Sequence, residues 1–236
     1  MLRLITDFDG PIVNVSVRYY TVYHLCLDRV VRPGQFLNRL PYEDFWACKR
    51  ARVPEWKIGL RSGLDEPQAR AFAKMRGLTV HNEHFLHHDL PVPGALEALE
   101  RLRNLGFDLV VMTMRRTREL NEALERCGLG HFFAPDRRYC LANDHVKIGD
   151  TKDKPILMQR ALRELPPADR TWMVGDTEAD ILAAQTGRVP AIGVLSGIRD
   201  RQQLETYRPD FILGNLSEAV DFILDSIDAP PLTATS

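Results

Sequence analysis

Short apolar runs rich in β-branched residues alternate along the chain with longer stretches in which apolar residues recur every three or four positions. The short runs predict strands and the longer stretches predict amphipathic helices. Such alternation is typical of βα units around a parallel sheet, so we expect an α/β fold. The predicted strands are residues 2–6, 108–112, 139–142, 171–174, 191–195 and 210–213. The predicted helices between them are residues 95–104, 118–127, 156–164, 178–185 and 217–224.

One long segment interrupts this alternation. Between residues 13 and 90, helical patterns follow one another without a clear strand, which predicts a helical insertion after the first strand. The insertion ends at residues 91–94, Pro-Val-Pro-Gly, a sequence that favours a stiff turn at a domain boundary. The Pro-, Thr- and Ser-containing residues 229–236 predict a flexible tail.

Composition narrows the class of partner. The 236 residues carry 31 Lys and Arg against 32 Asp and Glu, a formal net charge of -1, so no overall field attracts nucleic acid or an anionic membrane. The four cysteines are widely spaced and form no Cys-x-x-Cys motif, which favours reduced thiols. No stretch approaches the ~18 apolar residues of a membrane span. We therefore expect a soluble, cytoplasmic monomer or homodimer that acts on a small molecule.

Candidate chemistry lies directly after the predicted strands, because ligands bind beyond the carboxyl ends of parallel strands. Asp7 and Asp9 follow the first strand, and the two can reach one cavity, so that one carboxylate attacks while the other moves a proton. The alternative is a simple Asp-x-Asp-Gly turn. Asp176 and Asp180 follow a later strand, where clustered carboxylates favour Mg²⁺. Their alternative is a helix cap and a first-turn acid.

Two further groups suit an anionic substrate. Thr113 and the backbone amides of Met114 and Arg115 are predicted at a strand-to-helix junction, a geometry that binds phosphate oxygens. Lys154 could balance a nucleophilic carboxylate and a phosphate together. In the insertion, aromatic and basic residues are interleaved, and among these Arg50 and Lys57 are candidates for contact with the rest of the substrate. A solvated surface is the alternative for all of these basic residues.

The ordered motifs resemble those of the haloacid-dehalogenase-like hydrolase superfamily, particularly the phosphoglycolate-phosphatase and β-phosphoglucomutase type with a helical cap after the first motif. The residues that carry the resemblance are Asp7-Phe8-Asp9-Gly10, Thr113, Lys154-Pro155 and Gly175-Asp176-Thr177-Glu178-Ala179-Asp180. The resemblance spans nearly the whole chain. It implies a Rossmann-like three-layer core formed by residues 1–12 and 91–228, and a mostly α-helical cap formed by residues 13–90.

The resemblance also implies the role of each site residue. Asp7 would be the nucleophile that forms an aspartyl-phosphate, and Asp9 the acid that protonates the leaving oxygen and then activates water. Thr113 and Lys154 would bind the phosphoryl group. Mg²⁺ would be held by the Asp7 carboxylate, the Asp9 backbone carbonyl, Asp176 and, directly or through a neighbour, Asp180.

We therefore predict a Mg²⁺-dependent phosphatase for a small phosphorylated metabolite. A phosphomutase of the β-phosphoglucomutase type is the main alternative, and a non-catalytic phospho-receiver or binding module is another. Cleavage of carbon–halogen or carbon–phosphorus bonds fits less well, because family members with that chemistry generally lack the second aspartate. Pro11 departs from the family pattern, which usually has Thr or another small or β-branched residue there, so the loop after the nucleophile is expected to differ in detail.

Overall fold

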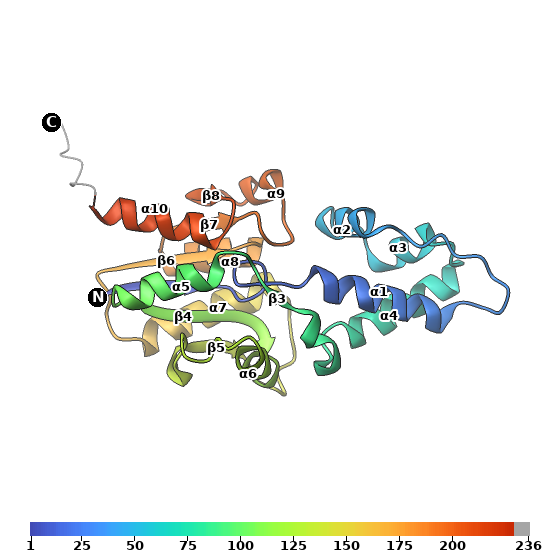
Figure 1. The fold of residues 1–236 in the computed structure, drawn as a ribbon, viewed down its shortest axis with the longest axis horizontal. Coiled ribbons are helices and arrows are strands. Elements are labelled where there is room, and N and C mark those ends of the chain that lie inside the picture. The colour runs from blue at the N-terminus through green and yellow to red at the C-terminus, as the bar shows by residue number, and fades with distance from the viewer. Residues whose placement is uncertain (229–236) are drawn as a thin grey trace.

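Six parallel strands form the centre of the larger part of the molecule, in the order β5-β4-β1-β6-β7-β8 (Figure 1). The computed structural model describes residues 1–228, so the predicted tail at 229–236 lies outside the described residues. The arrangement confirms the predicted α/β fold with a parallel sheet. The strands are β1 (Leu2–Thr6), β4 (Asp108–Arg116), β5 (Arg138–Leu141), β6 (Arg170–Gly175), β7 (Ala191–Val194) and β8 (Phe211–Leu213).

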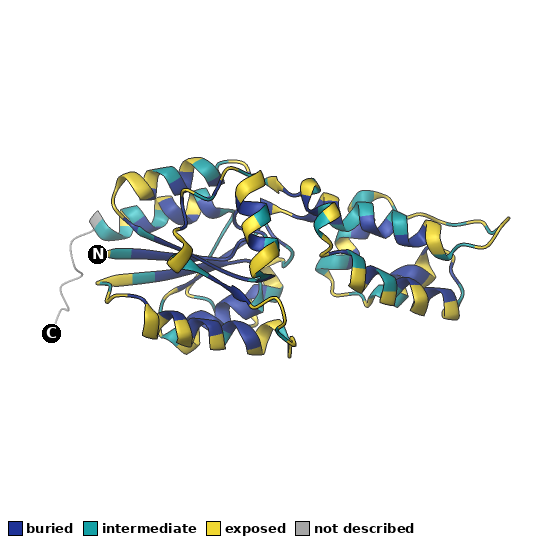
Figure 2. Cartoon of the chain, turned by 90° about the horizontal axis from the view of Figure 1, so that it is seen from below, coloured by how far each residue is buried: buried dark blue, intermediate teal, exposed yellow. Residues whose placement is uncertain are grey.

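Helices cover both faces of this sheet, which is why its strands are apolar on both sides. In β1, for example, Leu4 belongs to one buried cluster and Ile5 to the cluster on the opposite face. Figure 2 shows that the buried residues are concentrated in the strands and on the inward sides of the helices. One layer contains α5 (Ala95–Asn104), α6 (Thr117–Arg126) and α10 (Leu216–Asp228), and the other contains α7 (Asp150–Glu164) and α8 (Glu178–Gly187). The short elements η2 (Pro135–Arg137) and α9 (Arg201–Glu205) complete the core.

A separate group of helices follows β1 and packs around a buried cluster of its own (Figure 1). Tyr23 and Leu27 of its first helix lie in this cluster with Phe45 and Phe72, and all four are fully buried. We call this group the cap. Its elements are α1 (Ser16–Val30), α2 (Tyr42–Arg50), α3 (Glu55–Arg61), α4 (Glu66–Thr79) and η1 (Glu83–His88).

The chain enters and leaves the cap through a two-stranded antiparallel ribbon. Strand β2 (Val13–Asn14) pairs with β3 (Leu90–Pro91), and Val13 is the register partner of Pro91. The ribbon was not predicted, because two-residue strands carry too little pattern to read. The ribbon brings the two connections between core and cap side by side, next to the loop that follows β1.

The strand that carries Thr113 differs from its prediction. Residues 108–112 were expected, but β4 continues to Arg116, and its register against β5 shifts between Met112 and Arg116. Helix α6 begins only at Thr117, so Met114 and Arg115 are not at a helix start as predicted. Thr113 therefore lies in an irregularly paired stretch of β4 rather than at a helix terminus. No helix within residues 1–228 combines the length and the apolar composition needed to cross a bilayer.

Candidate active site

The loop after β1 holds Asp7 at the carboxyl edge of the sheet. Its backbone N–H donates to the carbonyl of Val174 on β6 at 2.8 Å, and its Oδ1 accepts a hydrogen bond from the Phe8 amide at 2.7 Å. Gly10 turns the chain with φ of 94°, a conformation that favours glycine. A Cβ there would lie 2.4 Å from the Asp176 carboxyl carbon, so the loop and β6 can approach only because this residue is glycine.

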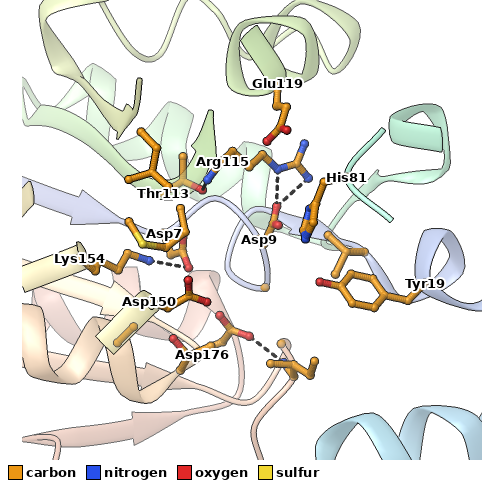
Figure 3. Close-up of a pocket in the computed structure, with 18 of the residues that line it drawn as sticks. Asp7, Asp9, Tyr19, His81, Thr113, Arg115, Glu119, Asp150, Lys154 and Asp176 are labelled. Atoms are coloured by element: carbon orange, nitrogen blue, oxygen red, sulfur yellow. Dashed lines mark hydrogen bonds and ion pairs between the residues drawn. The ribbon is translucent and has the colours of Figure 1, made fainter. Parts of the chain in front are cut away.

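Asp7 belongs to a buried cluster that has more acids than bases. Lys154 Nζ lies 2.7 Å from Asp7 Oδ2 and also forms an ion pair with Asp180, while Asp176 completes the group (Figure 3). We call Asp7, Lys154, Asp176 and Asp180 the acidic cluster. Each of the four is no more than 6% exposed. Three carboxylates and one ammonium therefore share a site that excludes most solvent.

The pKa values reflect this excess of negative charge. Burial, together with the neighbouring carboxylates of Asp180 and Asp176, raises the pKa of Asp7 well above its usual range despite the attraction of Lys154. Burial and the charge of Asp180 raise the pKa of Asp176 to about 7. Burial disfavours the ammonium form of Lys154, but Asp180 and Asp7 outweigh it and raise the pKa of this lysine. Without a further cation, Asp7 and Asp176 therefore resist ionisation.

This cluster fits a divalent metal ion. Asp7, Asp176 and Asp180 each offer a carboxylate oxygen, and these oxygens lie within 4.8 Å of one another. Hard oxygen ligands around excess negative charge suit Mg²⁺. The oxygens of Asp180 are also used elsewhere, because Oδ2 accepts from the Thr177 amide at 3.0 Å and Oδ1 pairs with Lys154. Asp180 therefore also positions Lys154 and caps α8.

Asp9 lies two residues beyond Asp7 and has different surroundings. Figure 3 shows Asp7 facing Lys154, whereas Asp9 faces Arg115. Arg115 donates to Asp9 Oδ1 through Nε at 2.8 Å, and Arg18 Nη2 lies 3.6 Å from Asp9 Oδ2. Burial favours the neutral acid, but Arg115 and Arg18 outweigh it and lower the pKa of Asp9. The Asp9 carboxylate does not belong to the group of close metal-binding oxygens.

A cavity of about 690 Å³ opens in front of both aspartates. Its core side includes the predicted residues Asp7, Asp9, Thr113, Met114, Arg115, Lys154 and Asp176. Thr113 Oγ1 accepts a hydrogen bond from the Arg115 amide at 3.2 Å, which holds its hydroxyl at this surface. The structure thus brings these residues together, and their catalytic and binding roles stay predictions. The volume suits a small molecule.

The cap side of the cavity was largely missed by sequence reasoning. Tyr19 and Trp46 line it with their ring centres 6.1 Å apart, and the ring centre of His81 lies 6.4 Å from that of Tyr19. Burial and the nearby guanidinium of Arg18 lower the pKa of His81 to about 4, so this ring is neutral at pH 7. Tyr19 and Trp46 lie in helical patterns that favour packing, although Trp46 is also among the interleaved aromatic and basic residues, and His81 lies in a polar segment before the hinge. Nothing in the sequence separates packing residues from cavity residues.

Arg50 and Lys57, the two cap residues predicted to contact substrate, lie outside the cavity lining. Arg50 Nη2 donates to the carbonyls of Gly197 at 2.9 Å and Leu195 at 3.3 Å, so it joins the cap to the core. Lys57 Nζ lies 5.5 Å from the centre of the Trp56 ring within the cap. Both residues therefore have other contacts, and their contact with substrate stays a prediction.

The chain is similar to known proteins in both sequence and structure. Residues 3–187 match the haloacid dehalogenase-like hydrolase family. The chain is 28% identical to "Probable phosphatase IndB" of Dickeya dadantii over 92% of this chain and 91% of that protein. It is 27% identical to pyrophosphatase PpaX of Bacillus velezensis, with 91% and 93% covered. A haloacid dehalogenase-like family hydrolase from Streptococcus pneumoniae superposes with a TM-score of 0.67 at 17% identity, covering 94% and 97% of the two chains.

The chain belongs to the haloacid dehalogenase-like hydrolase family, since the match covers well over half of its length. This confirms the resemblance predicted from the motifs and the predicted class of enzyme, a phosphoric ester hydrolase. The structural likeness at this low identity supports the fold alone.

Proposed function

We propose that this protein is a Mg²⁺-dependent phosphatase that hydrolyses a small phosphate monoester through an aspartyl-phosphate on Asp7. The observation that carries the proposal is the placement of Asp7. Its buried carboxylate lies at the carboxyl end of β1, 2.7 Å from Lys154 Nζ, on the floor of a cavity that Asp9 also faces. A buried carboxylate, a lysine ammonium group and a second carboxylate thus lie on one surface, which supports their proposed roles as nucleophile, phosphoryl-binding cation and acid.

The first half of the reaction uses both aspartates. An oxygen of ionised Asp7 attacks phosphorus, the bond from phosphorus to the ester oxygen breaks, and Asp9 gives a proton to that leaving oxygen. Because Arg115 and Arg18 lower the pKa of Asp9, this proton is one that Asp9 takes up from the bound phosphate monoanion.

Lys154, the Thr113 hydroxyl and the Met114 amide hold the phosphoryl oxygens. Asp7, Asp176 and the Asp9 backbone carbonyl would hold Mg²⁺, supported by Asp180. When bound, Mg²⁺ would neutralise charge on the acidic cluster and on the phosphoryl group.

In the second half, Asp9 acts as a base. It takes a proton from water, the water oxygen bonds to phosphorus, and the bond between Asp7 and phosphorus breaks to release phosphate. The cap covers the cavity and limits the access of bulk water to the site. Arg115 and Arg18 keep Asp9 near the reacting atoms between the two steps.

The proposal is tested with Mg²⁺ and a panel of small phosphate monoesters that also includes 4-nitrophenyl phosphate and inorganic pyrophosphate. We expect phosphate release from at least one monoester, and loss of that release in Asp7→Asn. Pyrophosphate belongs in the panel because one relative is a pyrophosphatase. Absence of turnover with every compound, or full activity of Asp7→Asn, would overturn the proposal. Discharge to an added sugar phosphate instead of water would identify a mutase.

A further inference from the structure

A second ionic cluster surrounds Asp9, and the reaction described above uses only part of it. Arg115 forms ion pairs with Asp9 and Asp89, and Arg18 forms ion pairs with the same two carboxylates. We call Asp9, Arg18, Asp89 and Arg115 the hinge charge cluster. The side chains of Arg18, Asp89 and Arg115 are at most 2% exposed, whereas that of Asp9 is 26% exposed and faces the cavity. Asp9, the proposed acid, is therefore the one member of the cluster that is accessible from the cavity.

The four members come from four segments that meet where the core joins the cap. Asp9 is on the loop after β1 and Arg115 is on β4, both in the core. Arg18 lies on α1, just after β2, and Asp89 lies between η1 and β3. Arg18 thus follows β2, and Asp89 directly precedes β3, so each strand of the two-stranded ribbon is close in sequence to one member of the cluster. A movement of the cap relative to the core would move Arg18 and Asp89 relative to Arg115.

Charge balance makes these contacts mutually dependent. Two guanidinium groups and two carboxylates cancel, and a buried charge that loses its partner is strongly destabilised. Arg115 is fixed from both sides, by Asp89 and by Asp9, and its guanidinium carbon lies 4.9 Å from the centre of the Phe8 ring. Arg18 is held by Asp89 at 2.9 Å and by the Val80 carbonyl at 3.1 Å. Asp89 therefore orients both arginines that contact Asp9.

We propose that Arg18 and Asp89 are positioning residues that set the place of the Asp9 carboxylate, directly and through Arg115, and link that place to the position of the cap. The inference rests on the proposed function. Proton transfer to a leaving oxygen requires hydrogen-bond distance, and a displacement of about 1 Å can cost roughly 10²-fold in rate. Loss of either residue displaces Asp9 without removing it. The attack of Asp7 on phosphorus does not itself use this proton, so an ester whose leaving group needs no proton is affected less.

The test compares kcat/KM for two esters of similar shape in Asp89→Asn and Arg18→Gln. Nitrophenolate leaves 4-nitrophenyl phosphate without needing a proton, whereas phenolate, a stronger base, leaves phenyl phosphate more readily when Asp9 protonates it. The kcat/KM value reports the steps up to departure of the leaving group, so it is independent of the later hydrolysis of aspartyl-phosphate. Two variants are made so that, if one of them does not fold, the other still tests the inference.

We expect kcat/KM for phenyl phosphate to fall by at least about tenfold more than kcat/KM for 4-nitrophenyl phosphate, a part of the 10²–10⁴-fold that an acid contributes. Asp108→Asn is the matched control. Asp108 is also a carboxylate between two arginines, with Arg3 Nε at 2.7 Å and Arg137 Nε at 2.6 Å, and its side chain is 10% exposed. It begins β4, seven residues before Arg115 and roughly 20 Å away along the strand.

The control is expected to lower stability and leave the ratio of the two kcat/KM values unchanged. If the ratio changes less than tenfold in the folded variants, or changes equally in Asp108→Asn, Arg18 and Asp89 are structural only and the inference is overturned. If the wild-type enzyme hydrolyses neither ester, or Asp7→Asn stays active, the proposed function fails instead, and this inference fails with it.

Discussion

Asp7 and Asp9 are two residues apart on one loop, yet they belong to ionic clusters of opposite kind. The acidic cluster around Asp7 has three carboxylates and one ammonium, and burial together with this shortage of positive charge raises the pKa of Asp7 and of Asp176. The hinge charge cluster around Asp9 has two carboxylates and two guanidinium groups, and it lowers the pKa of Asp9. The acidic cluster carries excess negative charge unless a further cation binds, whereas the charges of the hinge charge cluster balance.

The difference explains how one residue type can do two jobs in one cavity. A carboxylate in a cluster with excess negative charge attracts a metal ion and an electrophilic phosphoryl group, since both relieve the excess charge. A carboxylate in a balanced cluster is held in place and does not need a metal ion. In the metal-free protein the two pKa values are separated in the direction opposite to these roles, because a nucleophile acts in its ionised form and an acid in its protonated form. A bound cation would favour the ionised form of Asp7, and Asp9 would receive its proton from the bound substrate. Three changes to the clusters test whether the two are independent.

The largest effect is expected from Lys154→Met, which removes the only base of the acidic cluster. Turnover should fall by about 10²–10³-fold, because the phosphoryl group and Asp7 lose their shared cation. The free energy of unfolding without Mg²⁺ should fall by about 3 kcal/mol, since three buried carboxylates remain unpaired. Steady-state kinetics and chemical denaturation measure the two quantities. Lys152→Met, at an exposed position two residues earlier, is the control and should change neither.

A smaller effect is expected from Arg115→Lys, which keeps the charge of the hinge charge cluster but removes the guanidinium that contacts two carboxylates. The free energy of unfolding should fall by about 2 kcal/mol, because an ammonium cannot replace both contacts. The loss should be the same with and without Mg²⁺, since this cluster is already balanced. Denaturation curves at zero and saturating Mg²⁺ measure it, and a loss that Mg²⁺ cancels would show that the clusters are not independent.

The smallest effect, about 1 kcal/mol, is expected from Asp176→Asn in the metal-free protein, and its sign is the test. At pH 8 the variant should be more stable than wild type, because it removes one of the mutually repelling charges. The raised pKa of about 7 means that folded wild type takes up a proton as the pH falls from 8 to 5. Wild type should therefore gain stability over that range, and the advantage of the variant should shrink.

With saturating Mg²⁺, wild type should instead be more stable than Asp176→Asn. Wild type keeps all its metal-binding oxygens, and metal binding stabilises the folded state. Thermal unfolding across this pH range, with and without Mg²⁺, gives both comparisons. A variant that is less stable than wild type at pH 8 in the absence of metal would contradict the excess of negative charge in the acidic cluster.

Much of the acidic cluster and of the sheet could be predicted because their signals are local. Each predicted strand carries its own apolar run, and Asp7 and Asp176 follow such runs directly. Since parallel strands align their carboxyl ends at one edge of a sheet, local patterns are enough to bring these residues together. The end of β4 was wrong by four residues, because the irregular pairing of residues 113–115 has no sequence signature.

The hinge charge cluster could not be predicted in this way, because its contacts join segments far apart in the chain. Arg115 belongs to a basic run, which more often indicates a solvated surface. Arg18 offers one weak signal. It lies four residues before Val22, on the buried side of α1, where an arginine is unusual unless it is paired. The partner of that arginine, however, is known only once β2 and β3 are seen to run side by side.

The central claim is that phosphate passes through Asp7, and trapping the intermediate tests it most directly. The enzyme is mixed with Mg²⁺ and the best ester of the panel, quenched in acid during turnover and reduced with borohydride, which converts an acyl phosphate to an alcohol. Mass spectrometry of the peptides then locates the reduced side chain. We predict reduction at Asp7 alone, and none in Asp7→Asn. Sustained phosphate release with no reduced Asp7, or with reduction at another carboxylate, would contradict the account.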